Sequence, residues 1–276
     1  MNIPEYLKKL DCEGWPRVKN QNNQIVVFGR KGSGKTVKAA EYIAWADRPV
    51  VIVDTVGEFI GDYRHPGTGD VIFHALPVKP EHVPKALKEI FELMDLEAPA
   101  FPAQYVLSVQ VRGERGDLKG EARLRAFDDL CYQVYEVGNL IFVVDELDQW
   151  CGPASLPGGL RNIINYGRHS QVDFLGLSRR PARVHRDVTA NADTWHVFQT
   201  VEKRDLDYIR DLVPPHRAAE VDKLPALGVG ECLKFSVHDR AESVKESEPE
   251  FLGKPGPGGQ LGPADNIGGG ENEEVL

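Results

Sequence analysis

A glycine-rich loop between a short apolar strand and a helix constrains this chain more than any other feature of its sequence. An apolar run, Ile25–Phe28, leads into GRKGSGKT at Gly29–Thr36, and a helix-compatible segment follows from Val37 to Ala46. This is the pattern GxxxxGK[ST], the Walker A motif, in the strand, loop and helix context that it requires. Glycines let backbone N–H groups turn inward around phosphate oxygens, and the helix N-terminus adds partial positive charge. The loop therefore predicts a nucleotide phosphate site.

Two side chains of this loop have distinct expected roles. Lys35 should reach the β- and γ-phosphates, and the Thr36 hydroxyl should bind Mg²⁺. A glycine-rich turn that binds nothing would not need both the strand before it and the helix after it. The sequence thus predicts ATP and Mg²⁺ as ligands. The residues expected to bind the nucleotide are Gly29, Lys31, Gly32, Ser33, Gly34, Lys35, Thr36 and Val37.

A second apolar run ends in two adjacent acids. Leu140–Val144 has the composition of a buried strand, and Asp145 and Glu146 follow it, about 110 residues after Lys35. After a phosphate loop this pattern, the Walker B motif, places one carboxylate on Mg²⁺ and the next beside the attacking water. We assign Asp145 to the metal and Glu146 to general base catalysis. Adjacent acids also favour hydrolysis by water over transfer to a small molecule.

A third acid ends the β-branched run from Pro49 to Asp54. Ligands collect at the carboxyl ends of strands in open parallel sheets, so Asp54 is a candidate ligand-binding residue. An aspartate that only forms a turn would give the same pattern, and the sequence leaves both interpretations open.

The remaining pattern alternates short apolar runs with segments of helical periodicity. It predicts an α/β fold of the P-loop NTPase (RecA/FtsK-like) class, with a mostly parallel sheet flanked by helices. The expected domains are an N-terminal extension (1–23), an ATPase domain (24–241) and a disordered tail (242–276). The other expected strands are 71–76, 105–111, 172–178, 194–199 and 231–237, and the other expected helices are 80–96, 123–137, 156–166 and 205–212.

Charge is distributed unevenly along the chain. The formal net charge is -9, but the segment from Glu242 onward, rich in Gly and Pro, carries -6 of it, so the body carries only about -3. Between Arg161 and Arg186 six arginines face a single acid, Asp173. A local basic surface on an acidic protein suits contact with phosphate or nucleic acid, although a charge run is more often a solvated face.

Composition also excludes several classes of protein. No apolar run approaches the roughly 18 residues that span a bilayer, and the first residues lack a secretory apolar region. The four cysteines are scattered singly, which argues against zinc and against a disulfide framework. We expect a soluble, cytoplasmic protein.

Three segments together resemble the FtsK/HerA superfamily of ATPases. They are Asp54–Phe59, similar to D-x-x-GE-[FY], Gly167–Pro181, similar to a GR-containing segment that leads through a strand into [ST]-Q-R-P, and Leu227–Cys232, similar to a Gly-Glu motif before the last strand. The resemblance covers residues 25–237. It implies a ring-forming, usually hexameric, ATP-driven motor that moves double-stranded DNA.

The resemblance also implies roles for two arginines. Arg168 matches the position of a catalytic finger that acts on the neighbouring subunit's nucleotide, and Arg179 stands where the family usually has a glutamine that senses the γ-phosphate. Arginine can bind a phosphate bidentately, so sensing can proceed by other chemistry. A compact core without a membrane anchor looks most like viral genome-packaging ATPases, which implies partners at a capsid vertex or among membrane-associated packaging proteins.

Other functions remain open at this point. They are a host or mobile-element motor for DNA processing or transfer, a phage extrusion ATPase, a nucleotide-dependent assembly scaffold and, least favoured, a small-molecule kinase. For DNA contact the basic loop residues Arg112, Arg115 and Lys119 are the candidates, because binding to a phosphate backbone needs little more than positioned basic groups.

Overall fold

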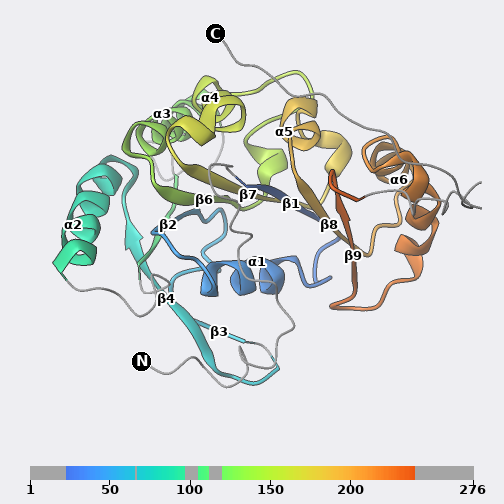
Figure 1. Ribbon diagram of the computed structural model, residues 1–276, viewed down its shortest axis with the longest axis horizontal. Helices are drawn as coiled ribbons and strands as arrows, with labels where there is room; N and C mark the ends of the chain where they lie inside the picture. Colours follow the sequence, from blue (N-terminus) through green and yellow to red (C-terminus); the bar gives the residue numbers. More distant parts are fainter. Residues whose placement is uncertain (1–22, 66, 97–104, 112–119, 240–276) are drawn as a thin grey trace, which may run out of the picture. The chain divides into compact units, whose positions relative to one another are not determined.

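The protein is built around one nine-stranded sheet with the order β3-β4-β5-β2-β6-β7-β1-β8-β9 (Figure 1). The structure is a computed structural model and describes residues 23–65, 67–96, 105–111 and 120–239. All neighbouring strands pair in parallel except at the two edges, where β3 is antiparallel to β4 and β9 to β8. The strands are β1 (Gln24–Phe28), β2 (Val50–Val53), β3 (Gly61–Arg64), β4 (Val71–Val78), β5 (Val106–Val109), β6 (Leu140–Val144), β7 (Val172–Ser178), β8 (Thr194–Phe198) and β9 (Cys232–Ser236).

Helices cover both faces of the sheet, and alternate residues of each central strand pack against opposite layers. In β2, Val51 and Val53 pack with residues of α2, α3 and α4, whereas Val50 and Ile52 pack with residues of α1. Figure 1 shows α1 on the opposite face of the sheet from α3 and α4. Burial on both faces explains why the central strands are continuous apolar runs. The α-helices are α1 (Lys35–Ala44), α2 (Val83–Leu96), α3 (Glu121–Val137), α4 (Gly158–Tyr166), α5 (Arg186–Ala190) and α6 (Lys203–Arg210).

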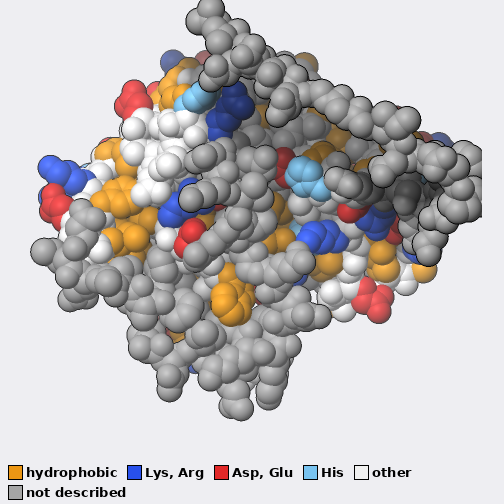
Figure 2. All heavy atoms as spheres, viewed as in Figure 1, with side chains coloured by type: hydrophobic (Ala, Val, Ile, Leu, Met, Phe, Trp, Pro, Cys, Tyr) orange, Lys and Arg blue, Asp and Glu red, His pale blue; other side chains and the backbone are white. Residues whose placement is uncertain are grey.

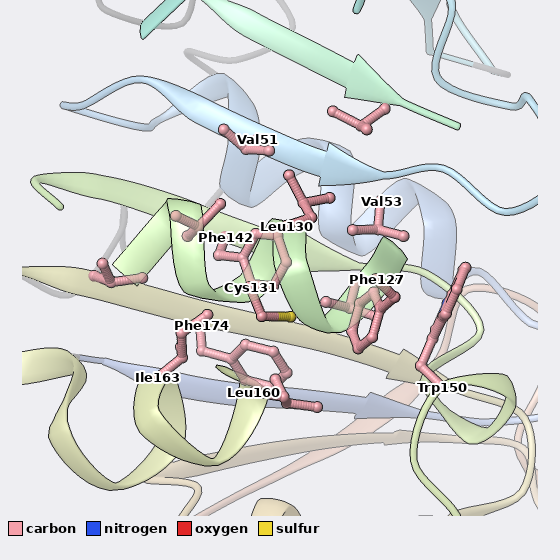
Figure 3. Packing of buried hydrophobic residues seen from close by; sticks show 14 of the residues in the cluster. Val51, Val53, Phe127, Leu130, Cys131, Phe142, Trp150, Leu160, Ile163 and Phe174 are labelled. Atoms are coloured by element: carbon pink, nitrogen blue, oxygen red, sulfur yellow. The ribbon is translucent and has the colours of Figure 1, made fainter. Parts of the chain in front are cut away.

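The larger core cluster lies between the central strands and α3 and α4 (Figure 3). Phe142 of β6 and Phe174 of β7 stand side by side in it, with ring centroids 6.5 Å apart. Phe127 of α3 packs against Trp150, which follows β6. This packing fixes the position of the carboxyl end of β6, where the two adjacent acids lie.

The predicted fold class is confirmed, with small differences in the ends of elements. The first helix begins at Lys35 instead of Val37, so the lysine lies in the first turn of α1. The predicted helix 80–96 consists of a 3-10 turn, η1 (Pro80–His82), followed directly by α2. Several elements were not predicted: β3, α5 and the 3-10 helices η3 (Leu147–Gln149), η4 (Gly167–His169), η5 (Pro181–Arg183) and η6 (Pro215–Ala226).

Some predictions fall on residues that the structure does not describe. These are the N-terminal extension up to residue 22, the tail from residue 240, and the proposed DNA-contacting residues Arg112, Arg115 and Lys119. Among the described residues, no helix is both long and apolar enough to cross a bilayer.

Candidate nucleotide site

The phosphate loop connects β1 to α1 and has the backbone that its glycines allow. Gly29, Gly32 and Gly34 have φ angles of 149°, 75° and 114°, a region that L side chains rarely adopt. At Gly29 a Cβ atom would also lie 2.6 Å from Phe198 Cβ, so the loop could not pack against β8 with any larger residue. Sequence and structure agree on a tight loop that opens directly onto a helix N-terminus.

Lys35 is buried beneath this loop. Its Nζ donates a hydrogen bond to the Arg30 carbonyl oxygen at 3.1 Å. Burial lowers the pKa of Lys35 to about 8, with the nearby Asp145 carboxylate opposing the shift and the Arg179 guanidinium adding to it. At neutral pH the ammonium group therefore remains mostly charged, as a phosphate ligand requires.

Asp145 lies at the carboxyl end of β6, opposite the phosphate loop. Its side chain is buried, and among the described residues none donates a hydrogen bond to its carboxylate. Burial, and next the charges of Glu58 and Asp54, raise the pKa of Asp145 to about 7 against the opposing charges of Lys35 and Arg179. A bound divalent cation would relieve this electrostatic stress.

Glu146 has a left-handed backbone conformation, with φ 49° and ψ 48°, which is uncommon for a residue with a side chain. Its carboxylate forms an ion pair with Arg179, from the end of β7, and accepts a hydrogen bond from the Gln149 side-chain amide. β6 and β7 are parallel neighbours, so their carboxyl ends bring Glu146 and Arg179 together.

Asp54 is a turn-forming residue, which settles the alternative that the sequence left open. Its carboxylate accepts hydrogen bonds from the backbone N–H groups of Gly57, Glu58 and Phe59, at 2.8, 3.0 and 2.9 Å. It also accepts one from the Ser108 hydroxyl at 3.2 Å. The turn that it holds places the Glu58 carboxylate 3.3 Å from the Thr36 hydroxyl.

These elements enclose a cavity of about 250 Å³ at the carboxyl edge of the sheet. Of the predicted site residues, Gly29, Ser33, Gly34 and Val37 belong to the loop and first helical turn but do not line the cavity. Glu58 and Ser178 line it without having been singled out from the sequence. The lining residues are Lys31, Gly32, Lys35, Thr36, Val56, Glu58, Asp145, Glu146, Leu177, Ser178 and Arg179.

The other arginines of the basic cluster do not line this cavity. Arg168 is exposed in η4, before the amino end of β7, at the sheet edge opposite the phosphate loop. Arg180 forms ion pairs with Glu202 and Asp205 of the α6 region, at 3.2 and 2.8 Å. Within one subunit, Arg179 is thus the arginine of this cluster that faces the cavity.

The residues present fit a nucleotide with Mg²⁺. Lys31 and Lys35 supply positive charge where phosphates would lie, and the loop glycines give backbone N–H groups close access. A hydroxyl and a carboxylate, from Thr36 and Asp145, are hard oxygen donors of the kind that Mg²⁺ prefers.

Comparisons with known proteins point to one fold. No family model matches the sequence, and no curated protein matches it. The genome packaging NTPase B204 of Sulfolobus turreted icosahedral virus 2, solved with ATP-γ-S, is similar with a TM-score of 0.55 and 14% identity, over 80% of this chain and 94% of that chain. VirB4 of Thermoanaerobacter pseudethanolicus is similar with a TM-score of 0.53 and 13% identity, over 82% of this chain and 90% of that chain.

The bacterial conjugative coupling protein TrwB, lacking 70 N-terminal residues, gives a TM-score of 0.51 and 10% identity, over 79% of this chain and 82% of that chain. The chain has the fold of the FtsK/HerA-type P-loop ATPases. The resemblance seen in the sequence is thereby confirmed at the level of the fold.

Proposed function

We propose that this chain is a Mg²⁺-dependent ATPase that moves double-stranded DNA, most specifically a viral genome-packaging ATPase. The observation that carries the ATPase proposal is the meeting of the phosphate loop, Asp145, Glu146 and Arg179 in one cavity. The likeness to B204, a genome packaging NTPase, over 94% of its length supports the packaging role.

In the proposed site, Lys35 and the loop amides hold the phosphates, and Thr36 and Asp145 hold Mg²⁺. The metal, when bound, neutralises charge that develops on the phosphoryl oxygens. Glu146 accepts a proton from the attacking water. Replacing Lys35 with Ala or Glu146 with Gln should abolish turnover, and full-rate hydrolysis by E146Q would contradict the general base assignment.

The Glu146–Arg179 ion pair gives Arg179 a specific part in this reaction. A carboxylate paired with a guanidinium is a poorer base, so Arg179 must leave Glu146 before water can be activated. A γ-phosphate in the cavity offers Arg179 a more highly charged partner. Arg179 would thus sense the nucleotide and free the base in one movement.

The assembly proposed for this motor is a ring, with six subunits as the family expectation. In it Arg168, remote from its own cavity, would act on the neighbouring subunit's nucleotide. R168A should inactivate the protein, and mixing R168A with K35A subunits should restore part of the activity, because some interfaces then pair an intact loop with an intact finger. R161A, at an exposed arginine of α4, is the matched control and should remain active.

The DNA-moving part of the proposal rests on the fold and not on a visible basic face. On the face drawn in Figure 2, the described Lys and Arg side chains occur in small separate groups, with Asp and Glu side chains among them. Contact with DNA through 112–119 therefore stays a prediction.

The test is the steady-state rate of ATP hydrolysis with and without long double-stranded DNA, at low and high salt. We expect stimulation by DNA that fades as salt rises, because phosphate contacts release counterions. An oligomer that hydrolyses ATP slowly and ignores DNA at low salt would favour the alternative, a nucleotide-dependent assembly scaffold. Packaging itself would then be tested with procapsids.

A further inference from the structure

The side chain of Glu146 is held from two directions. On the cavity side it pairs with Arg179, whose side chain is 41% exposed and itself lines the cavity. On the other side the Gln149 amide nitrogen donates to its second carboxylate oxygen. If Arg179 leaves Glu146 when nucleotide binds, Gln149 becomes the remaining group that fixes this carboxylate.

Gln149 ends η3 (Leu147–Gln149), one turn after Glu146, and its own orientation is set by a third residue. Both terminal nitrogens of Arg123 lie 3.4 Å from the Gln149 side-chain oxygen and donate to it. A guanidinium can only donate hydrogen bonds and an ionised carboxylate can only accept them. An amide between the two has one satisfactory orientation, with oxygen toward Arg123 and nitrogen toward Glu146.

Arg123 is fixed by packing, although its charge makes burial unfavourable. It is 7% exposed, and its guanidinium lies over the Trp150 ring at 3.9 Å from the centroid. Phe127 also stacks on Trp150, with the two ring centroids 4.6 Å apart (Figure 3). Burial lowers the pKa of Arg123, which shows the cost of keeping the charge there.

Trp150, which packs against Arg123, also contacts Asp145, the proposed Mg²⁺ ligand. Its Nε1 donates to the Asp145 carbonyl oxygen at 3.1 Å, and the Thr55 hydroxyl donates to that oxygen at 3.0 Å. One aromatic residue thus supports the backbone of Asp145 and the guanidinium that orients Gln149. Both candidate catalytic acids therefore depend on Trp150, which does not itself line the cavity.

We propose that Gln149 is the positioning residue for Glu146, and that Arg123, stacked on Trp150, orients Gln149 for this task. The inference rests on the proposed ATPase function and deepens it. It predicts that the two residues affect turnover and not nucleotide binding, since neither lines the cavity.

The experiment measures kcat and KM for ATP, and the affinity for a non-hydrolysable ATP analogue, in a set of single and double variants. In Q149A we expect kcat to fall roughly tenfold with KM and analogue affinity unchanged, since a misplaced base affects only the chemical step. Q149E keeps the size of the side chain but sets a carboxylate against Glu146. It should be slower than Q149A, whereas a purely structural role would leave it close to wild type.

Arg123 is tested through its dependence on Gln149. R123M keeps most of the packing on Trp150 and loses the donors, so it should lower kcat by less than Q149A does, and R123K should recover part of the loss. In the Q149A background R123M should have no further effect, because residues that act through one another are not additive. R125M, at an exposed arginine of the same helix, is the matched control and should leave kcat unchanged.

Failure of this inference can be told apart from failure of the proposed function. If wild type hydrolyses ATP no faster than K35A, the ATPase proposal is wrong. If wild type is active and K35A is not, yet Q149A retains the wild-type kcat, only the positioning role is wrong. If R123M lowers kcat by the same factor in the wild-type and the Q149A backgrounds, Arg123 does not act through Gln149.

Discussion

Asp54 and Asp145 occupy equivalent places on adjacent parallel strands, but their carboxylates differ in the hydrogen bonds that they accept. Each is the first residue after its strand, with Val53 paired to Val144, and each is buried. Asp54 accepts four hydrogen bonds from the chain around it, three of them from backbone N–H groups. Asp145 accepts none from the described residues at its carboxylate, and its pKa is raised to about 7. A carboxylate already satisfied by the chain is a structural element, whereas an unsatisfied one is available to a cation.

The largest expected effect is on turnover in D145N. Asn keeps the shape of the side chain but loses the charge that holds Mg²⁺. Several kcal/mol of charge stabilisation would be lost, so hydrolysis should fall by roughly a thousandfold. Phosphate release at saturating Mg²⁺ and ATP measures it. Turnover within a few-fold of wild type would break the distinction between the two aspartates.

The matching change at the other aspartate should affect stability. In D54N, one acceptor oxygen becomes an NH₂ donor that faces backbone N–H groups, which leaves buried donors unpaired. We expect a loss of about 3 kcal/mol in the free energy of unfolding. Urea unfolding of wild type, D54N and D145N measures it, with D145N as stable as wild type or more so. Equal stability of D54N and wild type would show that the turn does not need this carboxylate.

The raised pKa of Asp145 predicts how pH affects stability in metal-free protein. Between the ordinary value of 3.8 and the folded value of about 7, the unfolded chain has lost this proton and the folded chain retains it. The free energy of unfolding therefore decreases as pH rises through this range, by about 4 kcal/mol for this group, because each pKa unit corresponds to about 1.4 kcal/mol.

Asn at position 145 does not titrate, so the stability advantage of D145N over wild type should grow between about pH 4 and pH 8. Groups that do not interact with Asp145 cancel in this difference, including buried His196, whose pKa burial lowers to about 3. Urea unfolding in the presence of a chelator, repeated across this range, provides the comparison. A difference independent of pH would mean that Asp145 is not electrostatically stressed.

The smallest effect is expected at Glu58, which belongs to the turn held by Asp54 and also lines the cavity beside Asp145. The turn held by Asp54 carries it to Thr36, and its charge helps to raise the pKa of Asp145. Glu58 is largely exposed, so its charge should contribute less than about 1 kcal/mol. E58Q should weaken Mg²⁺ binding by only a few-fold in a titration of nucleotide-bound protein. A loss as large as that of D145N would make Glu58 a metal ligand in its own right.

The sequence predicted the fold well because the buried strands carry a strong signal. Runs such as Leu140–Val144 are apolar on both faces, and the phosphate loop and the Asp145–Glu146 pair follow such strands directly. β3 (Gly61–Arg64) was missed because it is a polar edge strand whose residues alternate between partial and full exposure.

The candidate site was predicted only in part, because strand order cannot be read from one sequence. The pairing of Glu146 with Arg179 requires β7 to lie beside β6, and the place of Glu58 requires the turn at Asp54. The Asp54–Phe59 motif was visible in the sequence, but the separate roles of its two acids depend on hydrogen bonds. Gln149 gave no signal at all, since its role depends on Arg123, 26 residues earlier.

Binding of Mn²⁺, as a spectroscopic substitute for Mg²⁺, tests the difference between the two aspartates most directly. Electron paramagnetic resonance titrations would compare wild type, D145N and D54N with a non-hydrolysable ATP analogue bound. Each protein is measured without urea, at a temperature at which it is folded. We expect D145N to bind Mn²⁺ at least about tenfold more weakly than wild type, while D54N stays within a few-fold of it. Wild-type affinity in D145N, or its loss in D54N alone, would contradict the assignment of Asp145 as the metal ligand and Asp54 as the turn-forming residue.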